Sequence, residues 1–295
     1  MIIFKLLLFI ILIVLSILYI LNINKIKETF QNNNTIDGIS YEDNIPRLKL
    51  LYGRNGVSIG DTQKYGRCLI IDNEIQLCSK KEYIYHELIV HFPYQYLKGD
   101  LKKVIIVGGG DLMTLREIMK YKSIEKVYML ELNKRIVNKC KKYFNVSDFK
   151  EDPRVEIIYG DAYKTIDKLQ NEVGQIDMCI VDTTEDNTNN LSVDSRSFFY
   201  KCLNLLNDKG VLVKNGEYFA DLFSNKMSLD CIIFGDYMPY FNSVYQFVVC
   251  GKKGNNIQKK HIFKSKWLKE KINTKYYSVN KHNDFILYDV FNFVE

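Results

Sequence analysis

The chain has 295 residues, a length that suits one large domain or a domain with a small appendage. Hydrophobic residues make up 47% and charged residues 26% of the sequence, a composition that excludes an intrinsically disordered protein. The net charge of +6 comes from lysines scattered over the whole chain, so we interpret it as solvated surface and expect no nucleic-acid partner.

The first predicted element is a transmembrane helix at residues 1–24, which would anchor the protein to a membrane in a single pass. An almost unbroken apolar run extends from Leu6 to Leu21, and about 20 apolar residues span a bilayer. A cleaved signal peptide is the alternative, but "YILNINKIKE" offers no small-residue cleavage site. Lys5 and the N-terminus on one side nearly balance Lys25 and Lys27 on the other, so charge leaves the orientation open.

Two segments separate the anchor from the main domain. Residues 25–45 are polar and asparagine-rich, which predicts a linker. Residues 46–98 contain short β-like runs with turns, such as "GVSIGDTQKYGRCLIIDNEIQL", and end in the helix-like "KEYIYHELIVHFPY". We therefore predict a small N-terminal β domain there.

Residues 99–295 alternate between strand-like and helix-like patterns. The strand-like runs are "KKVIIVG", "KVYMLEL", "RVEIIYG", "QIDMCIVD", "GVLVKN", "FNSVYQFVV" and "KHIFKSK". Helical patterns such as "TLREIMKY" lie between most of them. Runs that are apolar on both faces and joined by helices predict an α/β fold with a Rossmann-like, doubly wound, mostly parallel sheet.

The cysteines are widely spaced, odd in number and without a CxxC pair. They are Cys68, Cys78, Cys140, Cys179, Cys202, Cys231 and Cys250. Most lie in apolar runs, which favours small buried thiols over a zinc site or a disulfide scaffold. Unpaired thiols in turn indicate a reducing compartment.

Acidic residues follow four of the predicted parallel strands. Asp111 follows three glycines, Glu131 ends the second strand, Asp161 follows the third, and Asp182 ends the fourth. Ligands bind at the carboxyl ends of such strands, where glycines allow close approach and an acid on the second strand can bind both ribose hydroxyls. Asp161 with the backbone of Ala162 can bind an adenine edge. The pattern predicts a nucleoside pocket.

The excess of acid indicates the charge of the ligand. Two like charges about 4 Å apart repel by about 4 kcal/mol at an effective dielectric near 20, and a cationic ligand reverses that sign. We therefore predict a positively charged nucleoside and a second cation. Each acid taken alone, Asp161 above all, could instead cap the helix that follows it.

Several motifs in order resemble the spermidine synthase family, the polyamine aminopropyltransferases, from about Tyr52 to Val294. They are "YGRCLIIDNEIQLCSKKEYIYHELIVHFP", "VIIVGGGDLMTLRE", "EDPRVEIIYGDA", "IVDTTED", "FFYKCLNLLNDKGVLVKNGE" and "KYYSVNKHNDFILYDVFNFV". The resemblance implies a fold like that of class I methyltransferases. It also implies a role in polyamine biosynthesis: transfer of an aminopropyl group from decarboxylated S-adenosylmethionine to a diamine such as putrescine, releasing methylthioadenosine.

Residue roles come from the same resemblance. It implies a donor-binding set of Asn55 (where glutamine is usual), Gly108, Gly109, Gly110, Asp111, Glu131, Asp161 and Ala162. Asp111 would hold the aminopropyl ammonium, and the amine site would be lined by Gln76, Tyr85, His86, Asp111 and Glu185. Asp182 matches the catalytic aspartate. A homodimer is also expected, with no permanently bound cofactor.

The implied chemistry needs Asp182 for a physical reason. An alkyl amine has a pKa near 10.4 and is protonated at neutral pH. A carboxylate within hydrogen-bond reach can orient the amine and take its proton as nitrogen attacks the carbon next to the sulfonium. The leaving thioether is neutral, so we expect no metal ion.

The sequence departs from the family pattern at several positions, and two of these departures bear most on the substrates. Leu112 and Met113 replace a small, usually glycine-rich pair, and they either narrow the aminopropyl cradle or pack the first helical turn. The acceptor loop "PTYxxG" is expected after "FNSVYQFVV", where the chain instead has "CGKKGNNIQKK" without a tyrosine. Lys252 and Lys253 would then bring positive charge toward an amine site, and the loop is either shortened and solvated or the acceptor site is altered.

Three functions remain open. The first is the aminopropyltransferase. The second is an S-adenosylmethionine-dependent methyltransferase, against which Asp111 argues because the methionine carboxylate would face it. The third is a catalytically inactive nucleoside- or polyamine-binding homologue. Cytosolic substrates and unpaired thiols favour a catalytic domain on the cytoplasmic side of the membrane.

Overall fold

The computed structural model describes residues 48–147, 149–184, 193–216, 229–254, 257 and 264–289. The predicted anchor, the predicted linker and Glu185 lie outside these residues. None of the helices within the described ranges is long and apolar enough to cross a membrane. Arg47–Glu295 form one compact unit, and the predicted domain boundary after residue 98 stays a prediction.

A small antiparallel sheet opens the described chain, with the order β1-β2-β3-β4. Its strands are Lys49–Arg54, Val57–Thr62, Gly66–Ile71 and Glu74–Cys78. Two-residue turns at Asn55-Gly56 and Asp72-Asn73 close two of its hairpins, and all four residues have positive φ, as tight hairpins of this kind require.

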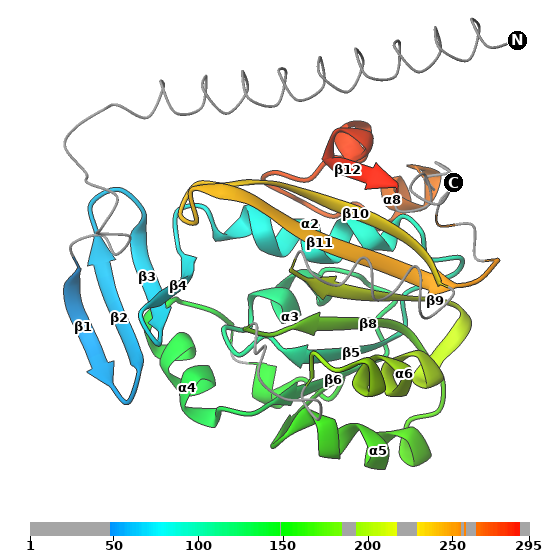
Figure 1. The fold of residues 1–295 in the computed structure, drawn as a ribbon, viewed down its shortest axis with the longest axis horizontal. Coiled ribbons are helices and arrows are strands. Elements are labelled where there is room, and N and C mark those ends of the chain that lie inside the picture. Colours follow the sequence, from blue (N-terminus) through cyan, green and yellow to red (C-terminus); the bar gives the residue numbers. More distant parts are fainter. Residues whose placement is uncertain are drawn as a thin grey trace, which may run out of the picture. The chain divides into compact units, whose positions relative to one another are not determined.

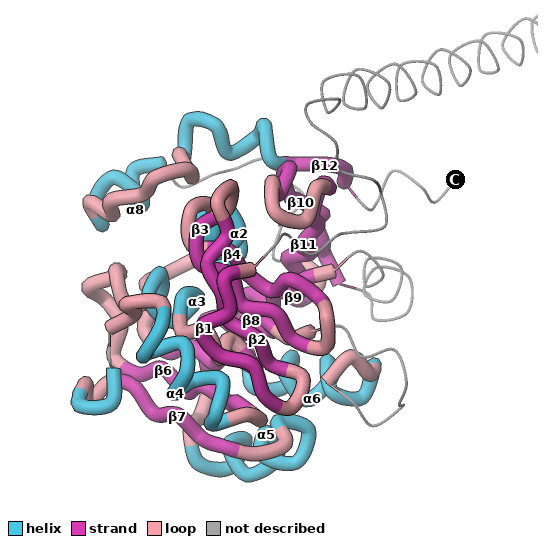
Figure 2. The backbone as a smooth tube through the Cα atoms, turned by 90° about the vertical axis from the view of Figure 1, so that its left-hand side faces the viewer, coloured by secondary structure: helices cyan, strands magenta, loops and turns pink. Residues whose placement is uncertain are grey.

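One face of the small sheet packs against α4 (Lys134–Tyr143). Ile59 and Leu69 of the sheet share a buried cluster with Met113 and with Cys140 of α4. Figures 1 and 2 show the small sheet beside this helix. The small sheet is therefore joined to the rest of this unit through apolar side chains as well as through the chain connection.

Helix α2 (Glu82–Tyr94) follows the small sheet and is buried along almost its whole length. Its apolar residues belong to the largest hydrophobic cluster, together with Val104 and Ile106. Because the helix is enclosed, its polar residues Glu82 and His86 have to find partners inside the protein.

The large sheet has eight strands within the described residues, in the order β12-β10-β11-β9-β8-β5-β6-β7 (Figure 1). The parallel strands are β5 (Lys103–Gly108), β6 (Lys126–Glu131), β7 (Val155–Tyr159), β8 (Ile176–Asp182) and β9 (Leu206–Asn215). The antiparallel strands are β10 (Leu229–Met238), β11 (Ser243–Lys252) and β12 (Ile286–Asp289).

Helices connect and cover the strands of this sheet. The remaining α-helices are α3 (Met113–Ile118), α5 (Ala162–Glu172), α6 (Arg196–Leu205) and α8 (Lys264–Glu270). Short 3-10 helices, η1 and η3, lie at Phe149–Glu151 and Val279–Phe285.

The predicted α/β fold is confirmed. Val104 and Ile106 of β5 belong to one hydrophobic cluster, and the alternating Ile105 and Val107 belong to another. Both faces of the strand are therefore buried, as in a doubly wound sheet. The strand prediction for "KHIFKSK" is wrong for the end of that segment, because Lys264 begins α8. Strands β10 and β12 were not predicted.

The prediction of unpaired thiols is wrong for four cysteines. Disulfides join Cys68 to Cys78 and Cys231 to Cys250, while the other three are free and buried. Each pair lies directly opposite on antiparallel strands, with Cα atoms 4.1 and 4.2 Å apart. Spacing along the sequence hides this pairing because strand register creates it. These four residues therefore no longer support a reducing compartment.

Candidate active site

The carboxyl ends of β8, β5 and β6 lie side by side at one edge of the large sheet (Figure 1). Gly108 pairs with Asp182 across β5 and β8, and Glu131 ends β6 on the other side. Asp111 follows in the loop between β5 and α3. Parallel strands thus deliver the three predicted acids to one place.

The glycine loop after β5 passes close to two of these acids. A Cβ on Gly108, whose φ is +81°, would lie 2.1 Å from the carbonyl oxygen of Asp182. A Cβ on Gly110 would lie 2.8 Å from Oε2 of Glu131. The amide of Gly109 donates a hydrogen bond to the Asp182 carbonyl at 2.9 Å. Glycine is needed here because the loop is pressed against both neighbouring strand ends.

Asp182 receives a hydrogen bond on each carboxylate oxygen. The Tyr85 hydroxyl donates to Oδ1 at 2.7 Å, and the Thr114 hydroxyl donates to Oδ2 at 2.6 Å. Burial of the carboxyl and the nearby Asp111 raise the pKa of Asp182, against the opposing effects of His86 and the two hydroxyls. The carboxylate is fixed in orientation and its basicity is increased, as a proton acceptor requires.

Asp111 lies between a backbone donor and a histidine. Its Oδ1 accepts a hydrogen bond from the amide of Met113 at 2.8 Å, and its Oδ2 lies 3.3 Å from Nε2 of His86. Burial lowers the pKa of His86, but Asp111 and Glu82 outweigh it and hold that pKa well above the usual value. His86 is therefore a cation that offsets part of the negative charge.

Glu131 completes the acidic group. Its Oε1 accepts a hydrogen bond from the amide of Asn133 at 2.7 Å. Burial, Asp111 and Asp182 raise its pKa, and backbone hydrogen bonds oppose the rise. Mutual repulsion among the acids is therefore present in the protein, as the sequence pattern predicted.

The other predicted site residues make their hydrogen bonds away from the three acids. Asp161 accepts a hydrogen bond from the amide of Tyr163 at 3.0 Å and caps α5. Ala162 is the first residue of that helix. Asn55 lies in the β1–β2 turn, and Gln76 of β4 donates to the carbonyl of Glu74 at 3.3 Å. Among the described residues, Asn55 and Gln76 make no hydrogen bond to the acids, and Glu185 lies outside that part of the chain.

A tyrosine that sequence reasoning missed lies in the turn between β10 and β11. Tyr240, in "MPYFNS", is 5% exposed, and its hydroxyl has no hydrogen-bond partner among the described residues. Burial raises its pKa well above the usual value, as do the charges of Glu82, Asp111 and Asp182. A tyrosine therefore lies near the acids, in the turn before β11 and not in the segment after β11 where the sequence analysis looked for one.

The lysines thought to approach the amine site lie elsewhere. Lys252 ends β11 and donates hydrogen bonds to the carbonyl of Leu206, at the start of β9, and to Asp208. The carboxyl end of β9, and not its start, lies beside that of β8. The charge of Lys252 is therefore satisfied at the opposite edge of the sheet.

Leu112 and Met113 pack the protein interior. Leu112 is fully buried in the largest hydrophobic cluster, and Met113 belongs to the cluster under the small sheet. Leu112 has a φ of +69°, a left-handed conformation that a side chain disfavours and that glycine adopts easily. Of the two interpretations of this pair, the contacts favour packing.

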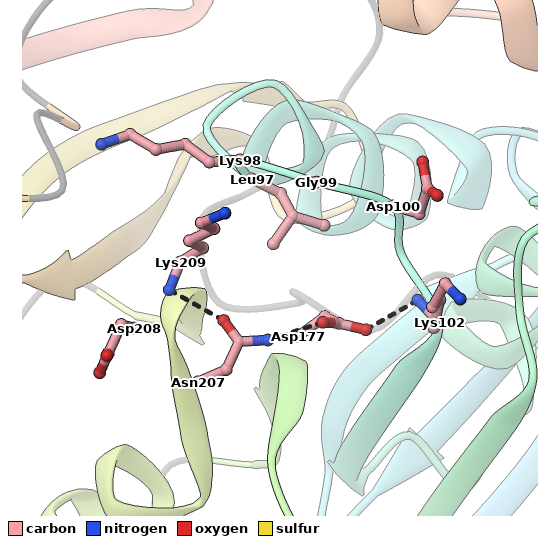
Figure 3. Close-up of a pocket in the computed structure, with 9 residues that line it drawn as sticks. All are labelled: Leu97, Lys98, Gly99, Asp100, Lys102, Asp177, Asn207, Asp208 and Lys209. Carbon is pink, nitrogen blue, oxygen red and sulfur yellow. Dashed lines mark hydrogen bonds between the residues drawn. The ribbon is translucent and has the colours of Figure 1, made fainter.

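A cavity of about 350 Å³ opens at the other edge of the sheet (Figure 3). Asp177 at the start of β8 lines it, accepting hydrogen bonds from the amides of Lys102 and Lys103, each at 2.8 Å, and from Asn207 at 2.7 Å. These hydrogen bonds connect three segments of the chain. The cavity lies away from the acids at the carboxyl ends of the strands.

Comparisons with known proteins identify the family. The family model of the spermine/spermidine synthase domain matches residues 82–260. A polyamine aminopropyltransferase of Methanocaldococcus jannaschii is 30% identical over 270 residues, which cover 88% of this chain and 90% of that protein. The polyamine aminopropyltransferase of Clostridium botulinum is 30% identical over 239 residues, 77% of this chain and 82% of its own length.

Solved structures share the fold. Spermidine synthase from Thermotoga maritima superposes with a TM-score of 0.71 at 23% identity, covering 82% of this chain and 86% of that one. A spermidine synthase in complex with the transition-state analogue AdoDATO gives the same values.

Proposed function

Because the chain belongs to the spermine/spermidine synthase family, we propose that it transfers the aminopropyl group of decarboxylated S-adenosylmethionine to a diamine such as putrescine. Methylthioadenosine is the second product. The observation that carries the proposal is the Asp182 carboxylate, which Tyr85 and Thr114 hold at both oxygens within the acidic group.

The acidic group supports a cationic donor. Asp111 would bind the ammonium of the aminopropyl chain, whereas the carboxylate of S-adenosylmethionine itself would meet the charge of Asp111. Glu131 would accept hydrogen bonds from the ribose hydroxyls. The glycine loop, Asp161 and Ala162 would complete the donor site, with Asn55 at its rim.

The acceptor amine would lie between Asp182 and two tyrosines. Tyr85 contacts Asp182 directly, and the buried Tyr240 hydroxyl is available to bind an amine. Gln76, His86 and Glu185 stay predictions for this half of the site.

The reaction then follows from simple chemistry. The amine nitrogen attacks the carbon next to the sulfonium, the carbon–sulfur bond breaks, and its electron pair stays on sulfur as a neutral thioether. The amine loses one proton, and Asp182 accepts it. Binding both reactants in one pocket supplies much of the rate, because it turns a bimolecular step into a unimolecular one.

Incubation of the full-length protein with decarboxylated S-adenosylmethionine and a mixture of diamines and polyamines tests the proposal. Mass spectrometry should detect methylthioadenosine and one amine heavier by an aminopropyl group, and Asp182→Asn should remove both. Donor binding without product would establish the inactive binding homologue. A methylated product from S-adenosylmethionine would establish the methyltransferase.

We propose further that residues 1–24 attach a homodimer to a membrane, with the catalytic domain on its cytoplasmic side. The apolar run of the sequence supports the attachment. Carbonate extraction of membranes, light scattering of the solubilised protein and protease protection of the catalytic domain test the three parts. The disulfides make the protease experiment the decisive one, because such bonds persist in oxidising compartments.

A further inference from the structure

A chain of polar contacts, buried at His86 and Glu82, leads away from the acidic group. It starts at Asp111, whose Oδ2 lies 3.3 Å from Nε2 of His86. The other ring nitrogen of His86 lies 2.9 Å from Oε2 of Glu82, four residues earlier on α2. Arg116 of α3 then donates two hydrogen bonds to the Glu82 carboxylate, each at 3.0 Å.

The geometry at His86 defines its protonation. A neutral imidazole donates from one nitrogen only, yet both nitrogens of His86 face carboxylate oxygens. An ionised carboxylate accepts hydrogen bonds and donates none. The side chain is 2% exposed, so water does not supply a donor in place of a ring proton. Both contacts are satisfied when His86 is an imidazolium.

Glu82 and Arg116 secure this state. The two-pronged contact of Arg116 orients the Glu82 carboxylate and keeps it charged. Burial raises the pKa of Glu82, but His86 and Arg116 together lower it to about 2. The carboxylate is thus ionised at neutral pH and holds a proton on the facing nitrogen of His86.

We propose that Glu82 and Arg116 are positioning residues, an inference that rests on the proposed aminopropyl transfer. They hold His86 as a buried cation against Asp111, and that cation keeps Asp182 ionised and ready to take a proton before any cationic substrate binds. Without the His86 cation, the substrate-free protein would place the Asp111 and Asp182 carboxylates together with no positive charge beside them. One of the two carboxylates would then take up a proton.

The surroundings of His86 are consistent with this role. Charged or titratable groups from six parts of the fold face His86 or the acids beside it. These parts are α2, the loop after β5, α3, β6, β8 and the β10–β11 turn. The groups are Glu82, Tyr85, Asp111, Arg116, Glu131, Asp182 and Tyr240. Arg116 is committed to Glu82 and Glu117. The imidazolium is therefore the cation closest to Asp111 among the described residues.

Glu82→Gln tests the proposal, with Glu117→Gln as the matched control. Glu117 is also buried and also accepts a hydrogen bond from Arg116, at 2.9 Å, but its histidine partner is His91. Nitrogen NMR of the imidazole and carbon NMR of the Asp182 carboxyl, recorded from about pH 5 to about pH 9, follow both groups directly. His86→Asn assigns the imidazole signals.

In the unmodified protein and in Glu117→Gln, both ring nitrogens of His86 should carry protons at neutral pH. In Glu82→Gln, His86 should lose a proton within that range, and the pKa of Asp182 should rise by about one pH unit. The acidic limb of kcat/KM should move to higher pH by the same amount. A shift of this kind separates positioning from a general loss of stability.

A neutral His86 in the unmodified protein at neutral pH would overturn the proposal, even if no variant folded. So would a titration of Asp182 that is the same in Glu82→Gln and in Glu117→Gln. The NMR readouts do not depend on turnover. A protein with an imidazolium at His86 but no transfer product would therefore reject the proposed function and leave the protonation of His86 established.

Discussion

Tyr85 and Asp182, 97 residues apart in the chain, meet through a hydrogen bond of 2.7 Å between the phenol and Oδ1. Helix α2 brings the first and the end of β8 brings the second. The ring of Tyr85 is held by Tyr245 and Phe247, whose centroids lie 5.4 and 4.9 Å away. The hydroxyl is thus placed by packing and not by the hydrogen bond itself.

Tyr85→Phe should raise the pKa of Asp182, because the phenol stabilises the charged carboxylate. Asp182 must be ionised to accept a proton. The acidic limb of the activity profile should therefore lie at higher pH in the variant than in the unmodified protein. A hydrogen bond to a charged group contributes about 1.5–3 kcal/mol, which predicts a fall in kcat of about tenfold or more. The pH profile of kcat/KM measures the first effect, and kcat at saturating substrate measures the second.

Tyr277→Phe is the matched control for that change. Its hydroxyl lies 2.8 Å from Nδ1 of His282, in the core and not at the acids. An acidic limb that moves equally in both variants would contradict the assignment of Tyr85 to Asp182.

Tyr240→Phe should separate stability from acceptor binding. Its buried hydroxyl lacks a partner among the described residues, so its removal should leave the free energy of unfolding unchanged or raise it by up to about 1 kcal/mol. The KM for the amine should rise several-fold, while donor affinity stays the same. Urea unfolding and steady-state kinetics with varied amine measure the two. A Tyr240→Phe protein that is less stable with an unchanged KM would show a purely structural tyrosine.

Leu112→Gly should destabilise the fold although it removes a strained backbone conformation. Glycine relieves about 1–2 kcal/mol at a left-handed position, but loss of a fully buried leucine side chain costs about 2–5 kcal/mol. The net loss should be about 2 kcal/mol in urea unfolding, the difference between the midpoints of these two ranges, with donor affinity unchanged. Markedly tighter donor binding would mean instead that Leu112 narrows the aminopropyl cradle.

Reduction should destabilise the protein. Under non-reducing denaturation, alkylation should label the three free cysteines, Cys140, Cys179 and Cys202, and spare the four in disulfides. Each closed loop should contribute about 3 kcal/mol, so the thermal midpoint should fall when a reductant is added. Cys231→Ala together with Cys250→Ala should remove part of that fall. Labelling of all seven cysteines before reduction would contradict both disulfides.

The sequence pattern predicts much of the acidic group because parallel strands obey a simple rule. Gly108, Glu131 and Asp182 each end a strand, and strand ends in a parallel sheet share an edge. No such rule applies to Thr114, which lies 68 residues from Asp182 and reaches it from α3 through a side-chain hydrogen bond. His86 is in the predicted set, but Arg116, which binds the Glu82 carboxylate beside it, becomes apparent only when α2 and α3 pack together.

The antiparallel part of the sheet limited prediction more strongly. Cys231 and Cys250 are opposite because β10 and β11 form a hairpin, and β10 was not recognised. Without β10 the hairpin turn is not apparent from the sequence, and neither is Tyr240 within it. The left-handed φ of Leu112 is also a tertiary effect, since burial of the side chain offsets a conformation that its local preference opposes.

The acidic group should select a cationic nucleoside without a carboxylate, and the affinity ratio for two ligands tests this selectivity most directly. Titration calorimetry of the full-length protein with decarboxylated S-adenosylmethionine and with S-adenosylmethionine gives that ratio without requiring turnover. We predict that the decarboxylated ligand binds at least about tenfold more tightly, a difference of about 1.4 kcal/mol, and that Asp111→Asn reduces the preference. Equal affinities, or tighter binding of S-adenosylmethionine, would contradict the account.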